Sequence, residues 1–199
     1  MKAAIEIGAL EAEIAACRAC AADFAATRTA HEPRPVTRLS ETAPVLVVGQ
    51  APGLRVHESG LPFDDRSGDR LRDWMGVDRP TFYDRRRIAI APMAFCFPGY
   101  DARGADLPPP KRCAALWRAR VMRALPAARL TLLVGGYAQK WALKDRRPLT
   151  AIVADWRDFG PGIFPLPHPS WRNIGWLKRN PWFEAEAVPA LRARLAALL

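Results

Sequence analysis

The chain has 199 residues, half of them hydrophobic, which is enough for one domain with its own core. It carries 30 Lys and Arg residues against 20 Asp and Glu residues, a formal net charge of +10 at pH 7. This charge favours a polyanionic partner, above all nucleic acid, although a GC-rich genome also enriches arginine.

The N-terminal segment has apolar residues at helical spacing from Ile5 to Cys17, which predicts a helix over about residues 3–22. Acidic residues interrupt this segment, and no apolar run of the chain reaches membrane-spanning length. We therefore expect a cytoplasmic protein that has neither a targeting peptide nor a membrane span. We also expect the protein to be a monomer. In that setting the four cysteines are metal ligands or core residues rather than disulfides.

Four short apolar runs predict buried strands, at residues 44–48, 87–95, 129–136 and 163–167. Helical patterns lie between and after them, at residues 69–75, 111–125, 137–144 and 181–199. Buried strands that alternate with helices are typical of a parallel sheet covered by helices. The sequence thus predicts an α/β fold in a single domain over residues 1–199: a three-layer α/β/α sandwich with a central, mostly parallel four-stranded sheet.

The loops after the strands are the candidate site, because α/β sheets bind their ligands at the carboxyl ends of the strands. Residues 49–53 follow the first strand, and their small side chains let backbone N–H groups approach a ligand closely. The turn at residues 60–69 leads into a helix N-terminus, which favours anions such as phosphate. Within this turn Phe63 offers a flat face to a base.

The last strand ends in His168, which lies between two prolines. A lone histidine at a strand end is more often structural than catalytic, but the residues around it suit DNA. Trp suits insertion into a base stack, and Arg and Asn suit phosphate contacts. The predicted DNA-binding residues are Ser170, Trp171, Arg172, Asn173, Lys178 and Arg179.

Residues 49–53, 60–68 and 168–173 together resemble motif A, the stacking loop and motif B of the uracil-DNA glycosylase superfamily. Their order and separation match, and the resemblance covers nearly the whole chain. It implies a DNA-repair enzyme that flips uracil, or another deaminated or damaged base, out of single- or double-stranded DNA and hydrolyses its bond to the sugar. The residues that would hold the base are Gly49, Gln50, Ala51, Phe63, Ser67 and His168.

Within the superfamily the chain is most similar to the iron–sulfur families 4 and 5, with features of both. Gln50 stands where family 4 has Glu, and Pro92 stands where family 4 has an Asn that reads the uracil edge. Residues 65–71 and 168–173 look more like family 5, which is associated with broader substrates. The resemblance therefore implies weak discrimination between uracil and other bases, because strong discrimination needs buried hydrogen-bonding groups.

The spacing of the cysteines extends the resemblance. Two residues separate Cys17 from Cys20 and 16 separate Cys96 from Cys113, which is similar to the ligand spacing of the [4Fe–4S] cluster in both families. Such a cluster needs four thiolates, and the pattern uses every cysteine of the chain. The cluster would be structural, joining the N-terminal helix to the loop after Cys96. The alternative is four small buried apolar residues that never meet.

The resemblance also implies catalytic roles. His168 would donate a hydrogen bond to the carbonyl oxygen of the departing base, assisted by the backbone at Gln50 and Ala51. Asp65 is the best carboxylate for positioning water or stabilising the sugar cation, with Asp64 as the second choice, since the Gln50 side chain cannot accept a proton. The alternative role for both aspartates is to cap a helix.

Phe63 would stack on the flipped base, and Trp171 or Arg172 would fill the space that the base leaves. His31 and His57 are expected at the surface.

Other functions remain as alternatives. A module that binds lesions or single strands without cutting would use the same surface, and Gln50 and Pro92 motivate it. One branch of the superfamily stays covalently attached to uracil-DNA through a His after the third cysteine position, and residues 97–110 contain no His. A nucleotide-binding enzyme of unrelated chemistry would need a phosphate loop ending in Lys and Ser or Thr, which the sequence lacks.

Overall fold

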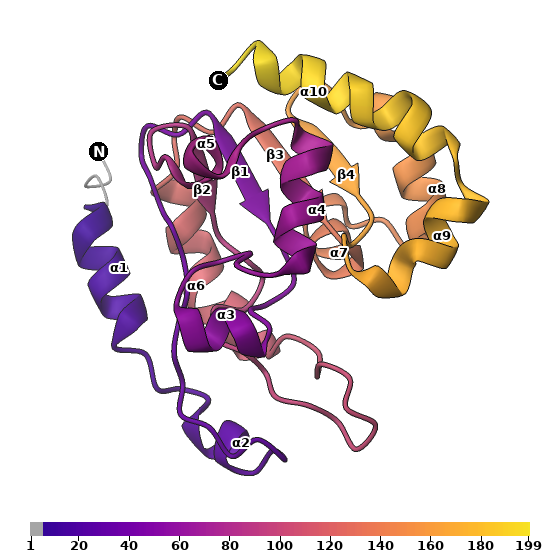
Figure 1. Ribbon diagram of the computed structural model, residues 1–199. Helices are drawn as coiled ribbons and strands as arrows, with labels where there is room; N and C mark the ends of the chain where they lie inside the picture. Colours follow the sequence, from indigo (N-terminus) through magenta and orange to yellow (C-terminus); the bar gives the residue numbers. More distant parts are fainter. Residues whose placement is uncertain (1–5) are drawn as a thin grey trace.

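The computed structural model describes residues 6–199. Its centre is a sheet of four strands, β1 (Val45–Val48), β2 (Ile88–Ile90), β3 (Leu130–Val134) and β4 (Ile163–Leu166), in the order β2-β1-β3-β4 (Figure 1). Val45 of β1 pairs with both Ile88 and Leu130, and every strand pair is parallel. The predicted α/β fold and its four-stranded sheet are therefore confirmed.

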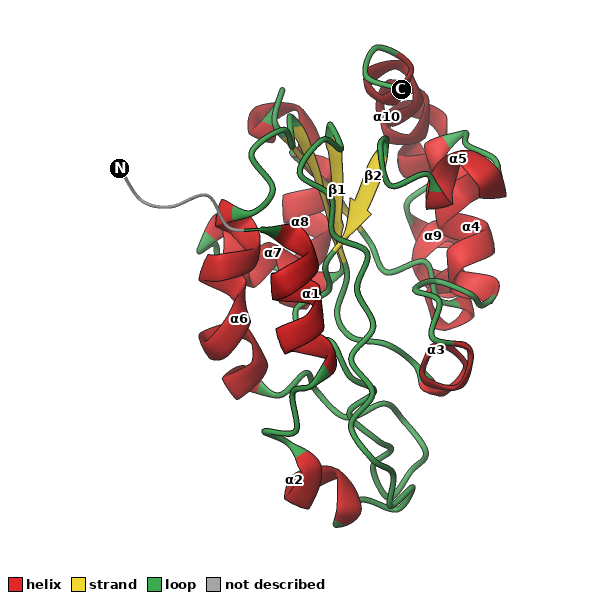
Figure 2. Cartoon of the chain, turned by 90° about the vertical axis from the view of Figure 1, so that its left-hand side faces the viewer, coloured by secondary structure: helices red, strands yellow, loops and turns green. Residues whose placement is uncertain are grey.

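Helices cover both faces of the sheet (Figure 2). They are α1 (Ile7–Ala15), α2 (Ala21–Ala25), α3 (Leu54–Ser59), α4 (Arg66–Met75), α5 (Arg79–Tyr83), α6 (Lys111–Arg123), α7 (Gly136–Leu143), α8 (Leu149–Ala154), α9 (Ile174–Arg179) and α10 (Val188–Ala196). Successive strand residues point to opposite faces. Val45 and Val47 accordingly belong to the core that α4, α5 and α10 cover, and Leu46 and Val48 to the core that α1, α6 and α7 cover. This arrangement is the predicted three-layer sandwich.

The predicted N-terminal helix is wrong in its extent. Residues 3–5 lie outside the described residues, α1 ends at Ala15, and α2 begins only at Ala21. Arg18 stabilises the break, because its Nη1 donates to the carbonyls of Ala15 and Cys17 at 2.9 and 3.0 Å. The break places Cys17 and Cys20 in a turn, where both thiols can face the same space.

The second strand is shorter than predicted. β2 ends at Ile90, whereas the apolar run extends to residue 95. The N–H groups of Met93 and Ala94 donate instead to the carbonyls of Gly49 and Gln50, at 2.9 and 3.1 Å. The backbone after β2 therefore leaves the sheet and runs along the loop at residues 49–53.

The C-terminal segment is helical, as predicted, although it begins with a π-helical stretch (Phe183–Ala187) before α10. Short 3₁₀ helices lie at Trp156–Phe159 and Trp171–Asn173. Within residues 6–199, none of the helices is both long enough and apolar enough to cross a bilayer.

Candidate functional site

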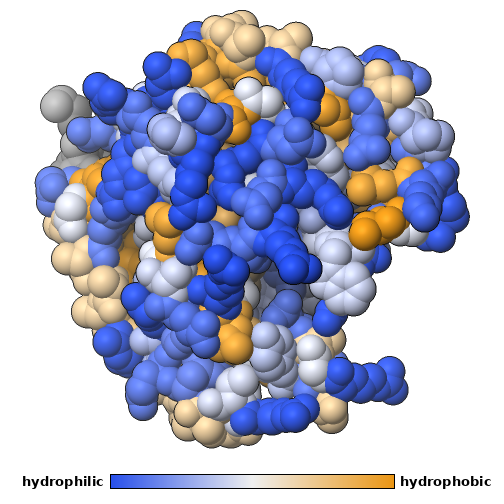
Figure 3. Space-filling model, viewed as in Figure 1, coloured by the Kyte–Doolittle hydropathy of each residue, from blue (hydrophilic) through white to orange (hydrophobic). Residues whose placement is uncertain are grey.

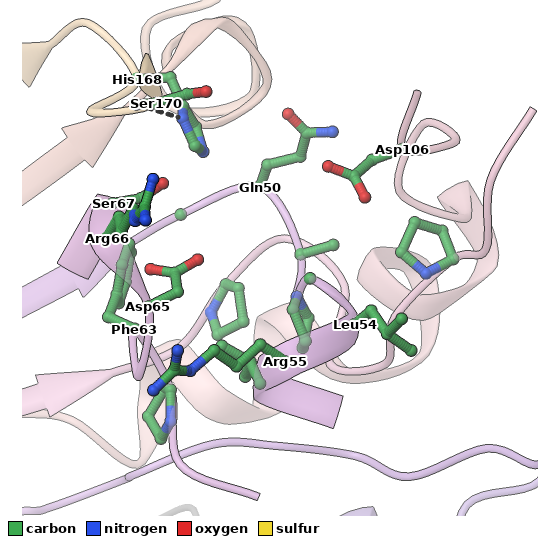
Figure 4. Close-up of a pocket in the computed structure, with 18 of the residues that line it drawn as sticks. Gln50, Leu54, Arg55, Phe63, Asp65, Arg66, Ser67, Asp106, His168 and Ser170 are labelled. Carbon is green, nitrogen blue, oxygen red and sulfur yellow. Dashed lines mark hydrogen bonds between the residues drawn. The ribbon is translucent and has the colours of Figure 1, made fainter. Parts of the chain in front are cut away.

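A cavity of about 650 Å³ opens where β1, β2 and β4 end (Figure 4). Pockets for small ligands typically have volumes of roughly 300–1,000 Å³. The structure places all the predicted base-binding residues in its lining: Gly49, Gln50, Ala51, Phe63, Ser67 and His168. They come from three segments of the chain that the parallel sheet brings to one edge.

Hydrophilic residues dominate the face of the molecule seen in Figure 3.

Among the predicted DNA-binding residues, those that line the cavity are Ser170, Trp171, Arg172 and Asn173. Trp171 is 66% exposed, and the Arg172 guanidinium lies 5.7 Å from the centre of its ring. Lys178 and Arg179 lie at the end of α9, outside the cavity lining.

Three neighbouring groups fix the half-buried His168 and the loop that follows it. The backbone N–H of Ser170 donates to His168 Nδ1 at 3.2 Å, so the ring proton belongs on Nε2. The Asn173 side chain donates to the carbonyl of His168 at 2.7 Å, and Arg70 of α4 donates to the carbonyl of Ser170 at 3.1 Å. Burial lowers the pKa of His168, against the opposing effect of the Asp65 carboxylate. The result is a neutral imidazole with one N–H donor.

Asp65 is the N-cap of α4 and also lines the cavity. Its Oδ1 accepts from the N–H of Gly68 at 2.8 Å, so the capping role considered from the sequence is present. Asp64 instead forms an ion pair with Arg79 at 2.8 Å, and the Arg79 hydrogen bond holds the pKa of this carboxyl below its usual value. Asp64 lies outside the cavity lining, which leaves Asp65 as the better placed of the two.

Phe63 adopts a left-handed backbone conformation, with φ of 56°. Residues other than glycine rarely adopt this conformation, which is costly unless the surroundings enforce it. Here Arg72, buried in α4, donates to the carbonyl of Phe63 at 3.2 Å, and the ring packs edge-on against Phe82. The ring of Phe63 is thereby held at the cavity beside Gly49, whose added Cβ would lie 3.1 Å from its Cζ.

The cavity wall after β2 includes Pro92, as the sequence indicated. Behind it, the buried guanidinium of Arg118 donates to the carbonyls of Ala91 and Pro92 and lies 4.9 Å from the centre of the Trp141 ring. Burial lowers the pKa of Arg118 to about 10. Sequence reasoning missed Arg118, because a basic residue within α6 has no pattern that distinguishes it from the exposed arginines of that helix.

Sequence reasoning also missed a second contribution to the cavity, from the hairpin at residues 98–108. Tyr100 and Asp106 of this hairpin pair across an antiparallel bridge, and both line the cavity. The sequence pattern by itself indicates only that this segment contains no histidine. Its Asp and Gly residues, typical of turns, were the available signal.

All four cysteines line a second, small cavity: Cys17, Cys20, Cys96 and Cys113. Burial raises the pKa of Cys96 to about 12 and that of Cys113 to about 11. Across residues 6–199, no group of three or more His, Cys, Asp or Glu side chains is arranged to hold a metal ion. The cysteines thus meet around one space without forming a site for a single ion.

The expectation that His31 and His57 lie at the surface is wrong, since both are half-buried. The His31 ring lies 5.0 Å from the rings of Phe24 and Phe97, and its Nε2 is within 2.9 Å of the Phe97 carbonyl oxygen. His57 packs edge-on against His31 at 5.1 Å. The two rings fill the space between α2, α3 and the segment after Cys96, a packing that no spacing in the sequence indicates.

Comparison with protein families agrees with this geometry. The model of the uracil DNA glycosylase superfamily matches residues 36–192, which include every strand of the sheet and every segment that lines the large cavity. The match covers far more than half of the chain. The chain therefore belongs to the uracil DNA glycosylase superfamily.

Proposed function

We propose that this protein is a DNA glycosylase that flips uracil, and other deaminated or damaged bases, into the large cavity and releases them by hydrolysis. The observation that carries the proposal is the orientation of His168: its Nδ1 accepts a hydrogen bond from Ser170, which leaves Nε2–H as a donor in the cavity lining. Membership of the superfamily supports the same class of reaction.

Binding would begin at the exposed rim. Trp171 has the size and exposure to enter the stack when a base leaves it, and Arg172 beside it suits a phosphate. Phe63 would stack on the extruded base, whose loss from the helix costs least where it is mismatched or single-stranded.

Cleavage of the bond between base and sugar leaves negative charge on the base and positive charge on the sugar. The Nε2–H of His168 would stabilise the developing oxyanion of the base, together with the backbone at Gln50 and Ala51. A donor fixed beforehand costs no reorganisation during the reaction, and the contacts of Ser170 and Asn173 hold His168 in this way. Asp65, the N-cap at the cavity wall, would stabilise the positive charge on the sugar.

Base selection would be broad. The backbone carbonyls of Ala91 and Pro92 already accept hydrogen bonds from Arg118, which lies behind the cavity wall. The Pro92 side chain itself can form no hydrogen bond with a base. Weak discrimination follows because the part of the wall formed by Pro92 offers a base no side-chain donor or acceptor.

We also propose that the four cysteines hold a [4Fe–4S] cluster. Their arrangement around one cavity supports this, since a four-iron cluster takes one thiolate from each of four cysteines and is larger than a single ion. The cluster would act structurally, joining the turn after α1 to the segment after β2 and to α6.

Alkaline cleavage of labelled oligonucleotides, each carrying one uracil, hypoxanthine or ethenocytosine, tests the function in single and double strands. We expect strand cleavage at the modified position with wild-type protein and not with undamaged DNA. Tight binding of these oligonucleotides without release of any base would show that the protein is a recognition module instead.

A further inference from the structure

The hairpin at residues 98–108 presents a carboxylate to the cavity. Asp106 and Tyr100 form the antiparallel bridge, and the N–H of Leu107 donates to the carbonyl of Gly99 at 2.9 Å. At the tip, Asp101 Oδ1 accepts from the N–H groups of Arg103 and Ala105 at 2.8 and 2.9 Å. Backbone hydrogen bonds thus fix the position of Asp106 in an element that is otherwise irregular.

The Asp106 carboxylate and the Gln50 side chain point toward one another on one side of the cavity, whereas Asp65 lies on the other side, near Ser67 and below His168 (Figure 4). The two carboxylates therefore approach a bound nucleotide from different directions. Gln50 takes the place of an acid in motif A, and Asp106 supplies a carboxylate on the same side.

The surroundings of Asp106 change its protonation. Its side chain is open to solvent, yet the cavity wall removes enough water to raise the pKa of the carboxyl above its ordinary value. Arg172, on the segment after β4, opposes this shift, and Asp65, at the start of α4, adds to it. On its own hairpin Asp106 faces Tyr100, whose pKa is itself raised, mainly by burial. A carboxylate with a raised pKa is a better proton acceptor than an ordinary surface carboxylate.

We propose that Asp106 is the general base of the glycosylase, the group that accepts a proton from the attacking water. This inference rests on the proposed function. The side-chain oxygen of Gln50 would accept the other hydrogen of the same water and so orient it toward the sugar.

In the reaction, the bond between C1′ and the base nitrogen breaks and its electron pair leaves with the base. The water oxygen forms a bond to C1′, one water proton passes to the Asp106 carboxylate, and the sugar keeps the hydroxyl. The proton then returns from Asp106 through solvent to the departed base anion. One water is consumed, no oxidant or reductant is needed, and the enzyme regains its starting state.

Asp65 and Asp106 would thus divide two tasks. Asp65 already uses one oxygen to cap α4, which suits it to a fixed electrostatic role beside the sugar. The contacts of the Asp106 hairpin are made by its backbone and by Asp101, which leaves the Asp106 carboxylate to accept a proton.

The test compares Asp106→Asn with a matched control in the same hairpin, Asp101→Asn, whose side-chain oxygen still accepts the tip hydrogen bonds. Single-turnover rates on uracil-containing single strands are measured from low to neutral pH. The wild-type rate should fall as the pH drops through the pKa of Asp106, because the protonated carboxyl cannot accept a proton. Asp106→Asn should lose roughly a hundredfold at neutral pH and lose this acid limb, as expected for removal of a general base.

Further readouts separate catalysis from structure. Asp106→Glu should recover part of the rate and the acid limb, and Asp106→Asn should bind a 2′-fluorinated uracil strand that resists cleavage as tightly as wild type. Asp65→Asn should be slower but keep the acid limb.

If the wild type is active and Asp106→Asn has the same rate and the same pH profile, the assignment of Asp106 as general base is overturned. The proposed glycosylase function is not affected by that result. Equal losses in Asp101→Asn and Asp106→Asn, without rescue by Glu, would overturn it in favour of a structural role. A wild-type protein that releases no base would overturn the proposed function, and this inference with it.

Discussion

Gly68, in the first turn of α4, lies directly against the carbonyl of Phe63: a Cβ added to Gly68 would stand 1.8 Å from that oxygen. Alanine is normally better than glycine inside a helix by up to about 1 kcal/mol. Here the collision should make alanine destabilising instead. Gly68→Ala should therefore lower the free energy of unfolding and displace the ring of Phe63, which would stack on the base. Urea unfolding measures the first effect and uracil release the second.

Gly136→Ala is the matched control, because a Cβ there meets only Leu149 Cδ1 at 3.8 Å, an ordinary contact, at the first position of α7. It should leave stability unchanged or raise it. A Gly68→Ala protein as stable and active as wild type would show that the turn before α4 adjusts freely.

His168→Ala should abolish most base release while DNA affinity stays nearly unchanged. The lost donor acts on charge that exists only in the transition state, and removal of one such donor costs roughly 10²–10³ in rate. Single-turnover cleavage and fluorescence anisotropy give the two quantities. If His168→Ala lost DNA affinity by the same factor as its rate of base release, His168 would contribute to binding of the uncleaved DNA rather than to stabilisation of the transition state.

Asp65 carries a helix cap as well as its proposed electrostatic role, and two substitutions separate them. Asp65→Asn keeps an acceptor for the Gly68 N–H and should be nearly as stable as wild type, yet slower in base release. Asp65→Ala should in addition lose about 0.5–2 kcal/mol of stability. If only Asp65→Ala were slow, the cap alone would explain the residue.

DNA binding should weaken steeply with salt, because each phosphate contact releases counterions. Arg172→Ala should lower the slope of log affinity against log salt by about 1. Arg157→Ala is the control: Arg157 pairs with Glu186 at 2.9 Å and lies outside the cavity lining. Anisotropy across a salt series measures both, and equal slopes for wild type and Arg172→Ala would remove Arg172 from the interface.

Protein purified without oxygen should contain about four irons per chain and absorb in the thiolate-to-iron charge-transfer region. Cys96→Ser and Cys113→Ser should each lose most of the iron. Metal analysis decides the point, and wild-type iron far below one per chain would contradict the cluster.

The fold was largely predictable because its signals are local. Continuous apolar runs predict β1, β3 and β4, and the motif loops after β1 and β4 predict residues that line the cavity. The break between α1 and α2 was not predictable from the sequence. The apolar spacing continues through it, and the break depends on hydrogen bonds from Arg18 to backbone carbonyls. Arg118 and Asp106 were missed for a similar reason. Only tertiary contacts bury Arg118, and only tertiary contacts bring Asp106 to the cavity.

The hairpin at residues 98–108 closes through its own hydrogen bonds, and at its tip Gly104 faces open space. Chain added at such a tip disturbs no packed neighbour, so insertions are tolerated there. The sheet and the hairpin can consequently vary separately during evolution. A change of one residue or of loop length in the hairpin would alter the group offered to the sugar, and related proteins could acquire different chemistry on an inherited scaffold.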